Sequence, residues 1–186
     1  GPTRTRKNLR ELHLPDRVRV VRQADRLTIT KEKKSLRSLL LSGKKLKSVS
    51  YFRTVDRPDA KKKEVRLEAI GAWMIFQRID VCGRIPIPSS GSEALMDWDR
   101  LVFPLTIRPP QPGDRFMPMG MAGRMKLKNF FINNKLPRTA RAQIPLVVSG
   151  NQIAWVAGMR IDERFKASSE TKTVLKAEVI YDRIAS

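Results

Sequence analysis

The stretch PLVVSGNQIAWVAG, residues 145–158, gives the clearest hairpin pattern in the chain. Two apolar runs flank the turn-forming residues Ser-Gly-Asn, which is typical of two antiparallel strands joined by a tight turn. Alternation of apolar and polar residues predicts a second hairpin at residues 17–30. Further strands are expected at residues 64–70, 73–81, 100–108 and 172–180. Because the strands follow one another in hairpins and do not alternate with long helices, we predict an α+β fold with mainly antiparallel sheet.

The helices of this fold are expected to be short. Residues 125–135, MKLKNFFINNK, place Leu127, Phe130 and Phe131 at the three- and four-residue spacing of one helix face. The two aromatic side chains are therefore expected in the core rather than stacked on bases. The segment PSSGSEALMD, residues 88–97, has no comparable pattern, and we expect a loop or a single turn of helix there.

The chain divides where its composition changes. Residues 31–48, KEKKSLRSLLLSGKKLKS, surround an apolar centre with lysines, which predicts a short amphipathic helix ended by Gly43. A basic, polar connection follows at residues 51–64. We therefore predict a basic linker that contains the first hairpin, residues 1–50, and a C-terminal domain, residues 51–186.

The net charge is the strongest compositional signal. The chain has 38 Lys and Arg against 18 Asp and Glu, a formal net charge of +20, and residues 1–66 alone hold 21 basic and 7 acidic residues. The expected partner is a polyanion, nucleic acid before an anionic membrane. No apolar run approaches the ~20 residues of a membrane span, and no leader pattern opens the sequence. The single cysteine, Cys82, is expected as a small buried residue, and we predict a cytoplasmic protein without membrane association.

The sequence offers little for catalysis. Its one histidine is His13, and no His, Cys or carboxylate cluster has the spacing of metal ligands. The acid pairs Asp97/Asp99 and Asp162/Glu163 each have a neighbouring arginine, which favours structural ion pairs over acid–base work. We therefore expect no catalytic residue, no metal and no cofactor in this chain.

The segment RPPQPGDRFMPMGMAGRMKLKNFF, residues 108–131, combines stiff and flexible backbone with positive charge. Its prolines fix φ on the approach to a turn at Gly113 and Asp114, where the Asp114 carboxylate can accept backbone N–H bonds and hold Arg115. Gly120 permits positive φ before the helix, and the methionines are expected as flexible packing. A rigid loop would thus aim a helix start and several cations at a phosphate backbone.

The same segment and those after it resemble the C-terminal domain of bacterial tRNA(Ile)-lysidine synthase. The similarity covers residues 97–179 and rests on the ordered pieces DWDRLVFPLTIR, PGDRF, KLKNFF, LPR, IPLVV, IAWVAGMRIDERF and TKTVLKAEV. The first hairpin, within LHLPDRVRVVRQADRLTIT, is similar to the segment that ends the middle domain of that enzyme. The fold of this family domain is also similar to a module of the phenylalanyl-tRNA synthetase β subunit.

The resemblance implies a function for the whole enzyme and for this part of it. The enzyme is a ligase that uses ATP, with magnesium, to adenylate the wobble cytidine of a minor isoleucine tRNA and then joins lysine to it. The Gly-rich SGGxDS loop that holds ATP in the family has no counterpart in this sequence. The chain would therefore be the part that grips the tRNA acceptor stem, and it would be inactive alone.

Carried to this sequence, the resemblance assigns tRNA contacts to the cations around the turn and the helix. These are Arg108, Arg115, Arg124, Lys126, Lys128, Lys135, Arg138 and Arg141. Gly113, Asp114 and Gly120 are expected to hold the turn. The motif RIDERF, residues 160–165, is either an interface or a buried ion-pair network, and we favour the network.

Two other kinds of function remain open from the residues. One is a protein-interaction module, including a homodimer formed through this region, whose cations serve solubility. The other is a self-contained enzyme, which the lack of a His, Cys or phosphate-loop constellation disfavours.

Overall fold

The computed structural model describes the backbone of residues 10–14, 18–23 and 26–31, and residues 50–182 apart from 60, 84, 86, 87 and 89. The chain forms two compact units, residues 1–35 and residues 36–186. The predicted helix within residues 31–48 lies outside the described residues. The predicted division at residue 50 therefore stays a prediction.

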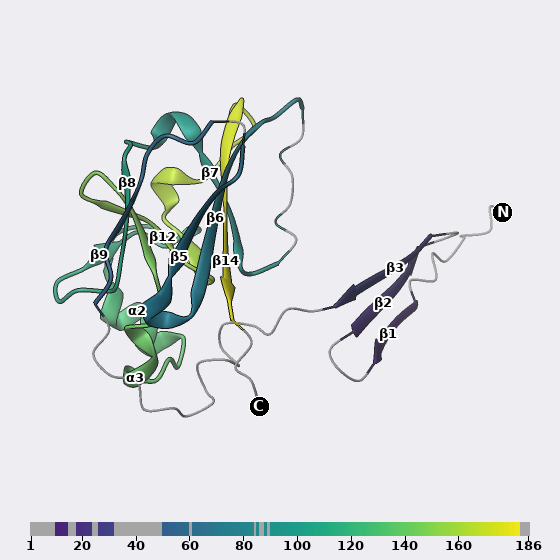
Figure 1. Cartoon of the computed structure of the whole chain (residues 1–186), viewed down its shortest axis with the longest axis horizontal. Helices are drawn as coiled ribbons and strands as arrows, with labels where there is room; N and C mark the ends of the chain where they lie inside the picture. The colour runs from purple at the N-terminus through teal and green to yellow at the C-terminus, as the bar shows by residue number, and fades with distance from the viewer. Residues whose placement is uncertain are drawn as a thin grey trace. The chain divides into compact units, whose positions relative to one another are not determined.

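The first unit contains an antiparallel sheet with the order β1-β2-β3 (Figure 1). Its strands are β1 (Arg10–Leu14), β2 (Val18–Gln23) and β3 (Arg26–Lys31). The pairing of β2 with β3 confirms the hairpin predicted at residues 17–30. The strand β1 was not predicted, because its short RELHL sequence offers only two apolar residues to reveal the alternation.

The second unit is built from two antiparallel sheets and a small hairpin, with the helices labelled α2 and α3 at one end (Figure 1). One sheet has the order β5-β6-β14-β7, with β5 (Lys63–Leu67), β6 (Ala72–Asp80), β14 (Thr173–Tyr181) and β7 (Glu93–Asp97). The other has the order β13-β12-β11-β8-β4, with β13 (Arg160–Ile161), β12 (Gln152–Val156), β11 (Leu146–Ser149), β8 (Leu105–Arg108) and β4 (Arg53–Val55). The small hairpin pairs β9 (Arg115–Phe116) with β10 (Met125–Lys126).

The helices of this unit are short, as predicted. They are α2 (Leu127–Asn133), α3 (Arg138–Arg141) and the 3-10 turns η2 (Glu68–Ile70), η3 (Trp98–Arg100) and η4 (Glu163–Phe165). No helix in the part of the chain that the structure describes has the length and apolar character needed to cross a membrane. These elements confirm the predicted α+β fold with mainly antiparallel sheet.

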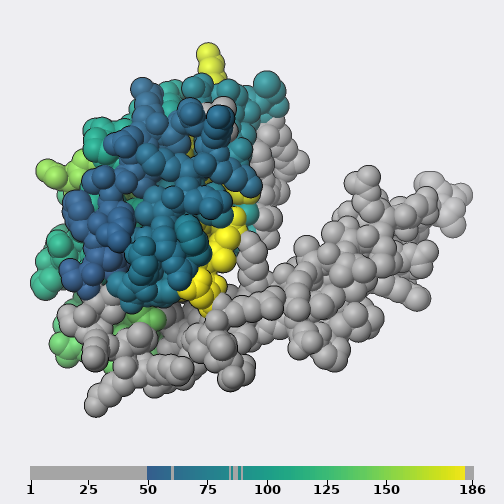
Figure 2. All heavy atoms as spheres, viewed as in Figure 1, coloured from purple at the N-terminus to yellow at the C-terminus, as the bar shows by residue number. Residues whose placement is uncertain are grey.

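The hairpin β11–β12 lies between two hydrophobic cores. Val147 and Trp155 point into a core that also contains Phe76 of the four-stranded sheet. Leu146 and Val156 point into a second core that packs against α2. Because neighbouring strand residues point to opposite faces, one hairpin can serve both cores. In the face that Figure 2 shows, residues of the β5–β6 pair, in blue, cover the molecule beside the C-terminal strand β14, in yellow.

The helix α2 contributes its predicted face to the second core. Leu127, Phe130 and Phe131 are all buried there, with Phe116 of β9 beside them. The rings of Phe116 and Phe130 meet edge to face, with their centroids 4.9 Å apart. This geometry is favourable for aromatic pairs and attaches the β9–β10 hairpin to the helix.

Three expectations about the second unit are wrong. Residues 93–97 form the strand β7 rather than a loop or helical turn, because pairing with β14 overrides the helix preference of Glu, Ala, Leu and Met. The strand expected at 100–108 begins only at Leu105, after the turn η3 and the cis peptide Phe103–Pro104. The side chain of Cys82 is exposed rather than buried.

The end of α2 yields a test of its geometry. Lys135 follows the helix with φ of 53°, and it is the one non-glycine residue with positive φ in the described part of the chain. A left-handed conformation is unfavourable for a residue with a Cβ atom. We therefore expect Lys135→Gly to raise the free energy of unfolding by about 0.5–1 kcal/mol, measured by urea denaturation.

A matched variant separates this effect from a general effect of glycine. Lys128→Gly, inside α2, should lower the free energy of unfolding by about 1 kcal/mol. If both variants were destabilised equally, the left-handed conformation of Lys135 would be wrong.

Candidate nucleic-acid interface

The β9–β10 hairpin contains one pair of residues that faces the core and one pair of exposed cations. Phe116 lies opposite Met125, and Arg115 lies opposite Lys126. Phe116 is fully buried in the second core, while Arg115 and Lys126 are exposed. Alternation along a strand thus places the two cations on the outer face.

Two more exposed cations adjoin this pair: Arg124 ends the hairpin loop, and Lys128 lies in the first turn of α2. We call Arg115, Arg124, Lys126 and Lys128 the hairpin cations. Within the described residues, none of them has a carboxylate partner within ion-pair distance.

The turn before β9 is organised by Asp114. Its carboxylate accepts two hydrogen bonds from the Arg108 guanidinium, at 2.7 and 2.9 Å, and one from the backbone N–H of Gln111 at 2.7 Å. Its carbonyl accepts the N–H of Leu127 at 2.8 Å, which joins the turn to the start of α2. The charge partner of Asp114 is therefore Arg108 rather than the expected Arg115. Gly113 precedes it with φ of 89°.

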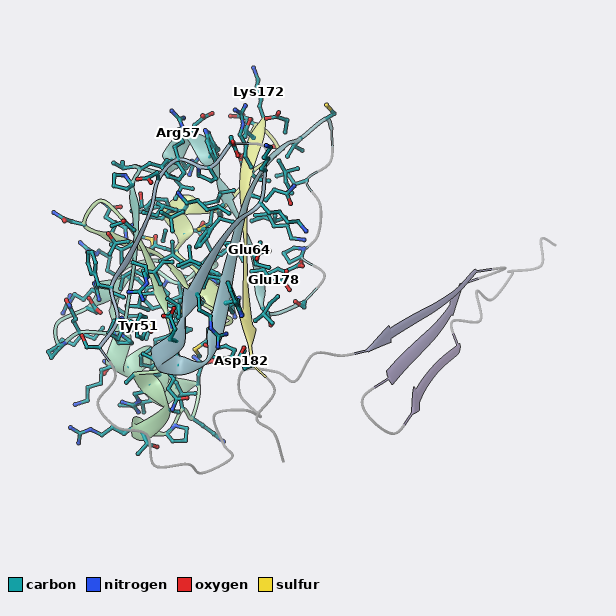
Figure 3. The ribbon with its side chains drawn as sticks, viewed as in Figure 1. Tyr51, Arg57, Glu64, Lys172, Glu178 and Asp182 are labelled. Atoms are coloured by element: carbon teal, nitrogen blue, oxygen red, sulfur yellow. The ribbon has the colours of Figure 1, made fainter. Side chains whose placement is uncertain are left out.

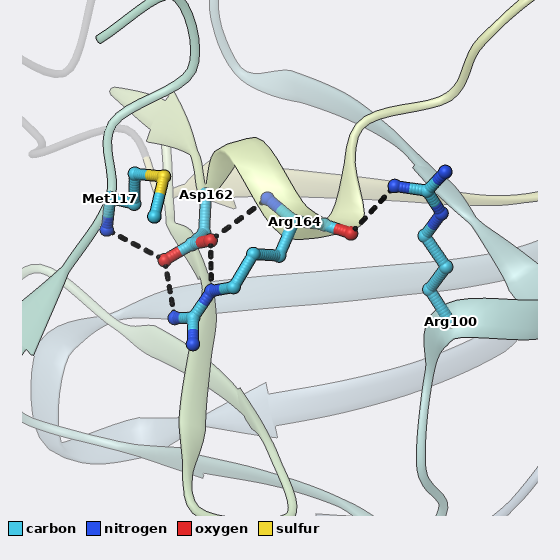
Figure 4. A network of polar contacts seen from close by, with 4 residues as sticks. All are labelled: Arg100, Met117, Asp162 and Arg164. Atoms are coloured by element: carbon cyan, nitrogen blue, oxygen red, sulfur yellow. Dashed lines mark hydrogen bonds and ion pairs between the residues drawn. The ribbon is translucent and has the colours of Figure 1, made fainter. Parts of the chain in front are cut away.

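The loop between β9 and β10, residues 117–124, is fastened to the η4 corner by Asp162 (Figure 4). The Asp162 carboxylate is fully buried and forms a two-point ion pair with Arg164, with both N···O distances 2.8 Å. It also accepts the N–H of Met117 at 2.8 Å and the N–H of Arg164 at 3.0 Å. Arg100 extends the network by donating to the Arg164 carbonyl at 3.2 Å. The prediction of an ion-pair network in residues 160–165 is confirmed.

Glu163 fastens the same loop one residue further along. Its carboxylate accepts the N–H of Gly120 at 2.8 Å and pairs with Lys166. Its own N–H donates to the Met117 carbonyl at 2.7 Å. Gly120 has φ of 86°, so the turn uses the conformational freedom of glycine. No local pattern indicated that Glu163 would hold Gly120, because the two residues lie far apart along the chain.

These contacts fix the ionisation of Asp162. Burial raises the pKa of this carboxyl, but hydrogen bonds from the Arg164 guanidinium and from the N–H groups of Met117 and Arg164 outweigh it. The net pKa lies below the ordinary value of 3.8. Hydrogen bonds from Lys166 and from the Gly120 N–H likewise lower the pKa of Glu163. Both carboxylates therefore stay charged at neutral pH, and the loop stays attached.

The remaining predicted contact residues fall into two groups. Lys135 and Arg138 are exposed at the connection between α2 and α3. Arg141 is half-buried, donates to the Leu136 carbonyl at 3.1 and 3.2 Å, and lies over the ring of Phe131. Arg108 is also occupied, by Asp114. Arg108 and Arg141 thus support the scaffold, while six of the predicted cations remain exposed.

A separate concave region lies toward the opposite end of the unit. Figure 3 shows Arg57 and Lys172 at this end and Asp182 toward the end where α2 and α3 lie. The guanidinium groups of Arg57 and Arg78 lie 5.1 and 5.4 Å from the centre of the Trp98 ring. The cleft has a volume of about 540 Å³ and is lined by Arg57, Pro58, Asp59, Arg78, Trp98, Asp99 and Thr173. Its two arginines and two aspartates balance, so it lacks the excess charge that attracts a polyanion.

Metal binding has no support in the described residues, where no group of three or more His, Cys, Asp or Glu side chains is placed to hold an ion. The carboxylates of Asp97 and Asp162 are both used structurally. Asp97 accepts from the hydroxyl of Thr171 at 2.7 Å and from the N–H of Asp99 at 3.0 Å. Asp97 also pairs with Arg100 at 3.5 Å, so the structural interpretation of Asp97, Asp162 and Glu163 is confirmed. Asp99 differs, because it is exposed and has no ion pair among the described residues.

The fold and this site define a mainly antiparallel α+β domain with an unneutralised cationic hairpin on a rigid scaffold. In a comparison with known families, residues 105–178 match the model of the TilS substrate C-terminal domain. The resemblance to the C-terminal region of tRNA(Ile)-lysidine synthase is confirmed over about half of the chain.

Individual relatives agree with this assignment. The tRNA(Ile)-lysidine synthase of Parabacteroides distasonis is 41% identical over 100 residues, which cover 54% of this chain and 23% of that protein. The chain thus matches less than a quarter of the relative's length. A crystal structure of a TilS C-terminal domain superposes with a TM-score of 0.58 at 24% identity, covering 73% of this chain and all of that one. A weaker similarity, with a TM-score of 0.44 and 15% identity over 49% of this chain and 28% of that one, is to an N-terminal fragment of the phenylalanyl-tRNA synthetase β subunit from Pyrococcus horikoshii.

The buried carboxylate of Asp162 yields a prediction on stability. Asp162→Asn should lower the free energy of unfolding at pH 7 by about 3 kcal/mol, because it leaves Arg164 without its charge partner. The pKa of Asp162 is lower in the folded protein than its ordinary value of 3.8. Its contribution to the free energy of unfolding is therefore fully present above pH 3.8, and it is lost as the pH falls through the folded-state pKa. Urea denaturation at several pH values should therefore show the two proteins converging below about pH 4.

The exposed carboxylate of Asp99 provides the control. Asp99→Asn should change the free energy of unfolding by less than about 0.5 kcal/mol. A difference between Asp162→Asn and the parent chain that did not depend on pH would contradict the ionised state of Asp162.

Proposed function

We propose that this chain binds tRNA through the hairpin cations together with Lys135 and Arg138. In this proposal it serves as the C-terminal region of a tRNA(Ile)-lysidine synthase and grips the acceptor stem. The step that uses ATP, with magnesium, to join lysine to the wobble cytidine belongs to the remainder of such an enzyme. Support comes from the family of residues 105–178, from the name of the relatives, and from the charge of this face.

The observation that carries the proposal is the imbalance of charge on a fixed scaffold. Residues 108–141 contain eight basic residues and one acid, Asp114. That acid is paired with Arg108, and both side chains are largely buried, at 10% and 16% exposed. The other cations therefore have no carboxylate of their own segment to neutralise them. Such a surface attracts phosphate groups and releases their counterions.

The composition of the face favours duplex RNA over a single strand. The large aromatic side chains exposed among the described residues are Phe52 and Trp73, and neither belongs to the β9–β10 hairpin or to α2. The aromatic residues of α2 are buried, so they cannot act as platforms for stacked bases. A surface with many cations and few free aromatics suits recognition of the backbone and shape of an RNA helix, such as the acceptor stem.

The helix start itself contributes less than its charges. α2 has seven residues, and the N–H of Leu127 is already bound to the Asp114 carbonyl. The cations of the hairpin, rather than the backbone N–H groups of the helix, therefore supply the attraction for phosphate. This is why the proposal names side chains and can be tested by replacing them.

The salt dependence of binding tests the proposal. With about six phosphate contacts, the logarithm of the association constant for an isoleucine tRNA should fall with the logarithm of salt concentration with a slope of roughly −4 to −5. Arg115→Ala and Lys126→Ala should each weaken binding by about 1 kcal/mol and reduce the slope by about 1, because each removes one phosphate contact. Fluorescence anisotropy of the complete 186-residue chain between 50 and 200 mM salt, on the order of physiological strength, measures both quantities.

Lys172→Ala serves as the matched control, because Lys172 is exposed at the other end of the unit (Figure 3). It should leave both affinity and slope close to those of the parent chain. Equal losses from all three variants would mean that the charge acts without a defined face. Protection of the tRNA backbone from cleavage should centre on the acceptor stem, and protection elsewhere would overturn that part of the proposal.

A further inference from the structure

We propose that Met119 and Met121 form an apolar tip that contacts the ribose and base edges in the minor groove of the bound RNA helix. This inference rests on the proposed function and adds the surface that the RNA presents to the hairpin loop. The minor groove of an RNA helix is wide and shallow and displays sugars and base edges between two rows of phosphate. The hairpin cations could contact the phosphates while the two methionines contact the sugars and base edges.

The first observation is the exposure of these two side chains. Met119 is 38% exposed and Met121 is 51% exposed, although both lie in the loop next to a hydrophobic core. Met125, by contrast, packs against that core. The loop therefore turns two methionines outward, which corrects the expectation that all of them serve as packing.

The second observation is that this loop is held in place rather than loosely exposed. The N–H of Met119 donates to the Ile161 carbonyl at 2.8 Å, and the N–H of Met121 donates to the Pro118 carbonyl at 2.9 Å. Between them, the N–H of Gly120 is bound by the Glu163 carboxylate at 2.8 Å. The backbone of the tip is thus ordered before any partner arrives, which lowers the entropic cost of binding.

The third observation is the positive charge of the hairpin that carries the tip. Arg124 lies within the loop, and Arg115 and Lys126 are opposite one another in the hairpin, one residue beyond the pair of Phe116 and Met125 that adjoins the loop. The nearby acids Asp162 and Glu163 are paired with Arg164 and Lys166. An apolar surface on another protein would gain no binding energy from these unpaired cations. A nucleic acid matches it, because its phosphates flank its sugars and bases.

The chemistry of methionine suits a groove rather than a stacked base. The thioether side chain is flexible and polarizable and adapts to irregular apolar surfaces. The segment 117–124 contains no aromatic residue, so it offers no platform for an unpaired base. Gly120, between the two methionines, has open space where a Cβ atom would lie, so the backbone itself can come close to a sugar.

The test separates apolar contact from charge. The double variant Met119→Ala/Met121→Ala should bind the isoleucine tRNA roughly 5- to 20-fold more weakly. The slope of the salt dependence should stay unchanged, because an apolar contact releases no counterion. Ile132→Ala is the control: Ile132 is an apolar residue of α2 that is 50% exposed but lies outside the loop, and its loss should leave affinity unchanged.

Three results would overturn the inference. The double variant could bind as tightly as the parent chain while Arg115→Ala weakens binding, which would leave the proposed function standing without the apolar contact. The slope could fall in the double variant, which would show that the loop acts through its cations. The loss could disappear with an RNA minihelix that lacks the single-stranded 3′ end, which would assign the methionines to unpaired nucleotides. If neither the methionine variants nor the cation variants changed binding, the proposed function itself would fail.

Discussion

The buried carboxylate of Asp162 is the contact on which the cationic face depends. One group binds the guanidinium of Arg164, the N–H of Arg164 and the N–H of Met117, so it joins the η4 corner to the hairpin loop. The arrangement is satisfied internally, because each oxygen has a donor within 3.0 Å. Without it, Arg164 would lose its charge partner and the loop would lose the contact through Met117, so that, among the described residues, only the contacts of Glu163 and Ile161 would hold it.

The hairpin β11–β12 provides the rigid support behind that contact. Every residue of β11 is buried, and its two faces belong to different cores. One core holds the two sheets together, and the other holds α2 and Phe116. Positions on α2 and on the β9–β10 hairpin are therefore set by the same central strands. Closely packed cores leave little room for backbone movement. This explains how the small hairpin and the start of α2 can hold the four hairpin cations in a constant arrangement.

The sequence predicted those parts of the structure that local patterns determine. The run at 145–158 and the spacing of Leu127, Phe130 and Phe131 identified a central hairpin and a helix face, because burial imposes a period of two on strands and nearly four on helices. The strand β7 could not be found in this way, since four of the five residues of Glu93–Asp97 favour a helix and the segment becomes a strand only by pairing with β14. Contacts between distant segments, such as Glu163 with Gly120, leave no local pattern at all.

The predicted ion pair between Asp114 and Arg115 does not form. Asp114 and Arg115 are neighbours in sequence, which favoured an ion pair between them, but β9 turns Arg115 outward opposite Lys126. The carboxylate is then reached by Arg108, which ends β8 and returns across the proline turn. Whether a basic residue is free or paired thus depends on strand direction rather than on distance along the chain, and sequence alone could not separate Arg108 from Arg115.

The acidic residues of this domain stabilise the scaffold and leave the exposed cations unpaired. Asp114, Asp162 and Glu163 each accept a backbone N–H, and they pair with Arg108, Arg164 and Lys166. Each acid therefore fixes a turn and neutralises a cation that lies within the scaffold. The hairpin cations have no such partner among the described residues. They repel one another, and the buried contacts of the backbone that carries them keep them in place. A phosphate backbone would relieve that repulsion, which is how these cations would contribute to the proposed binding of RNA.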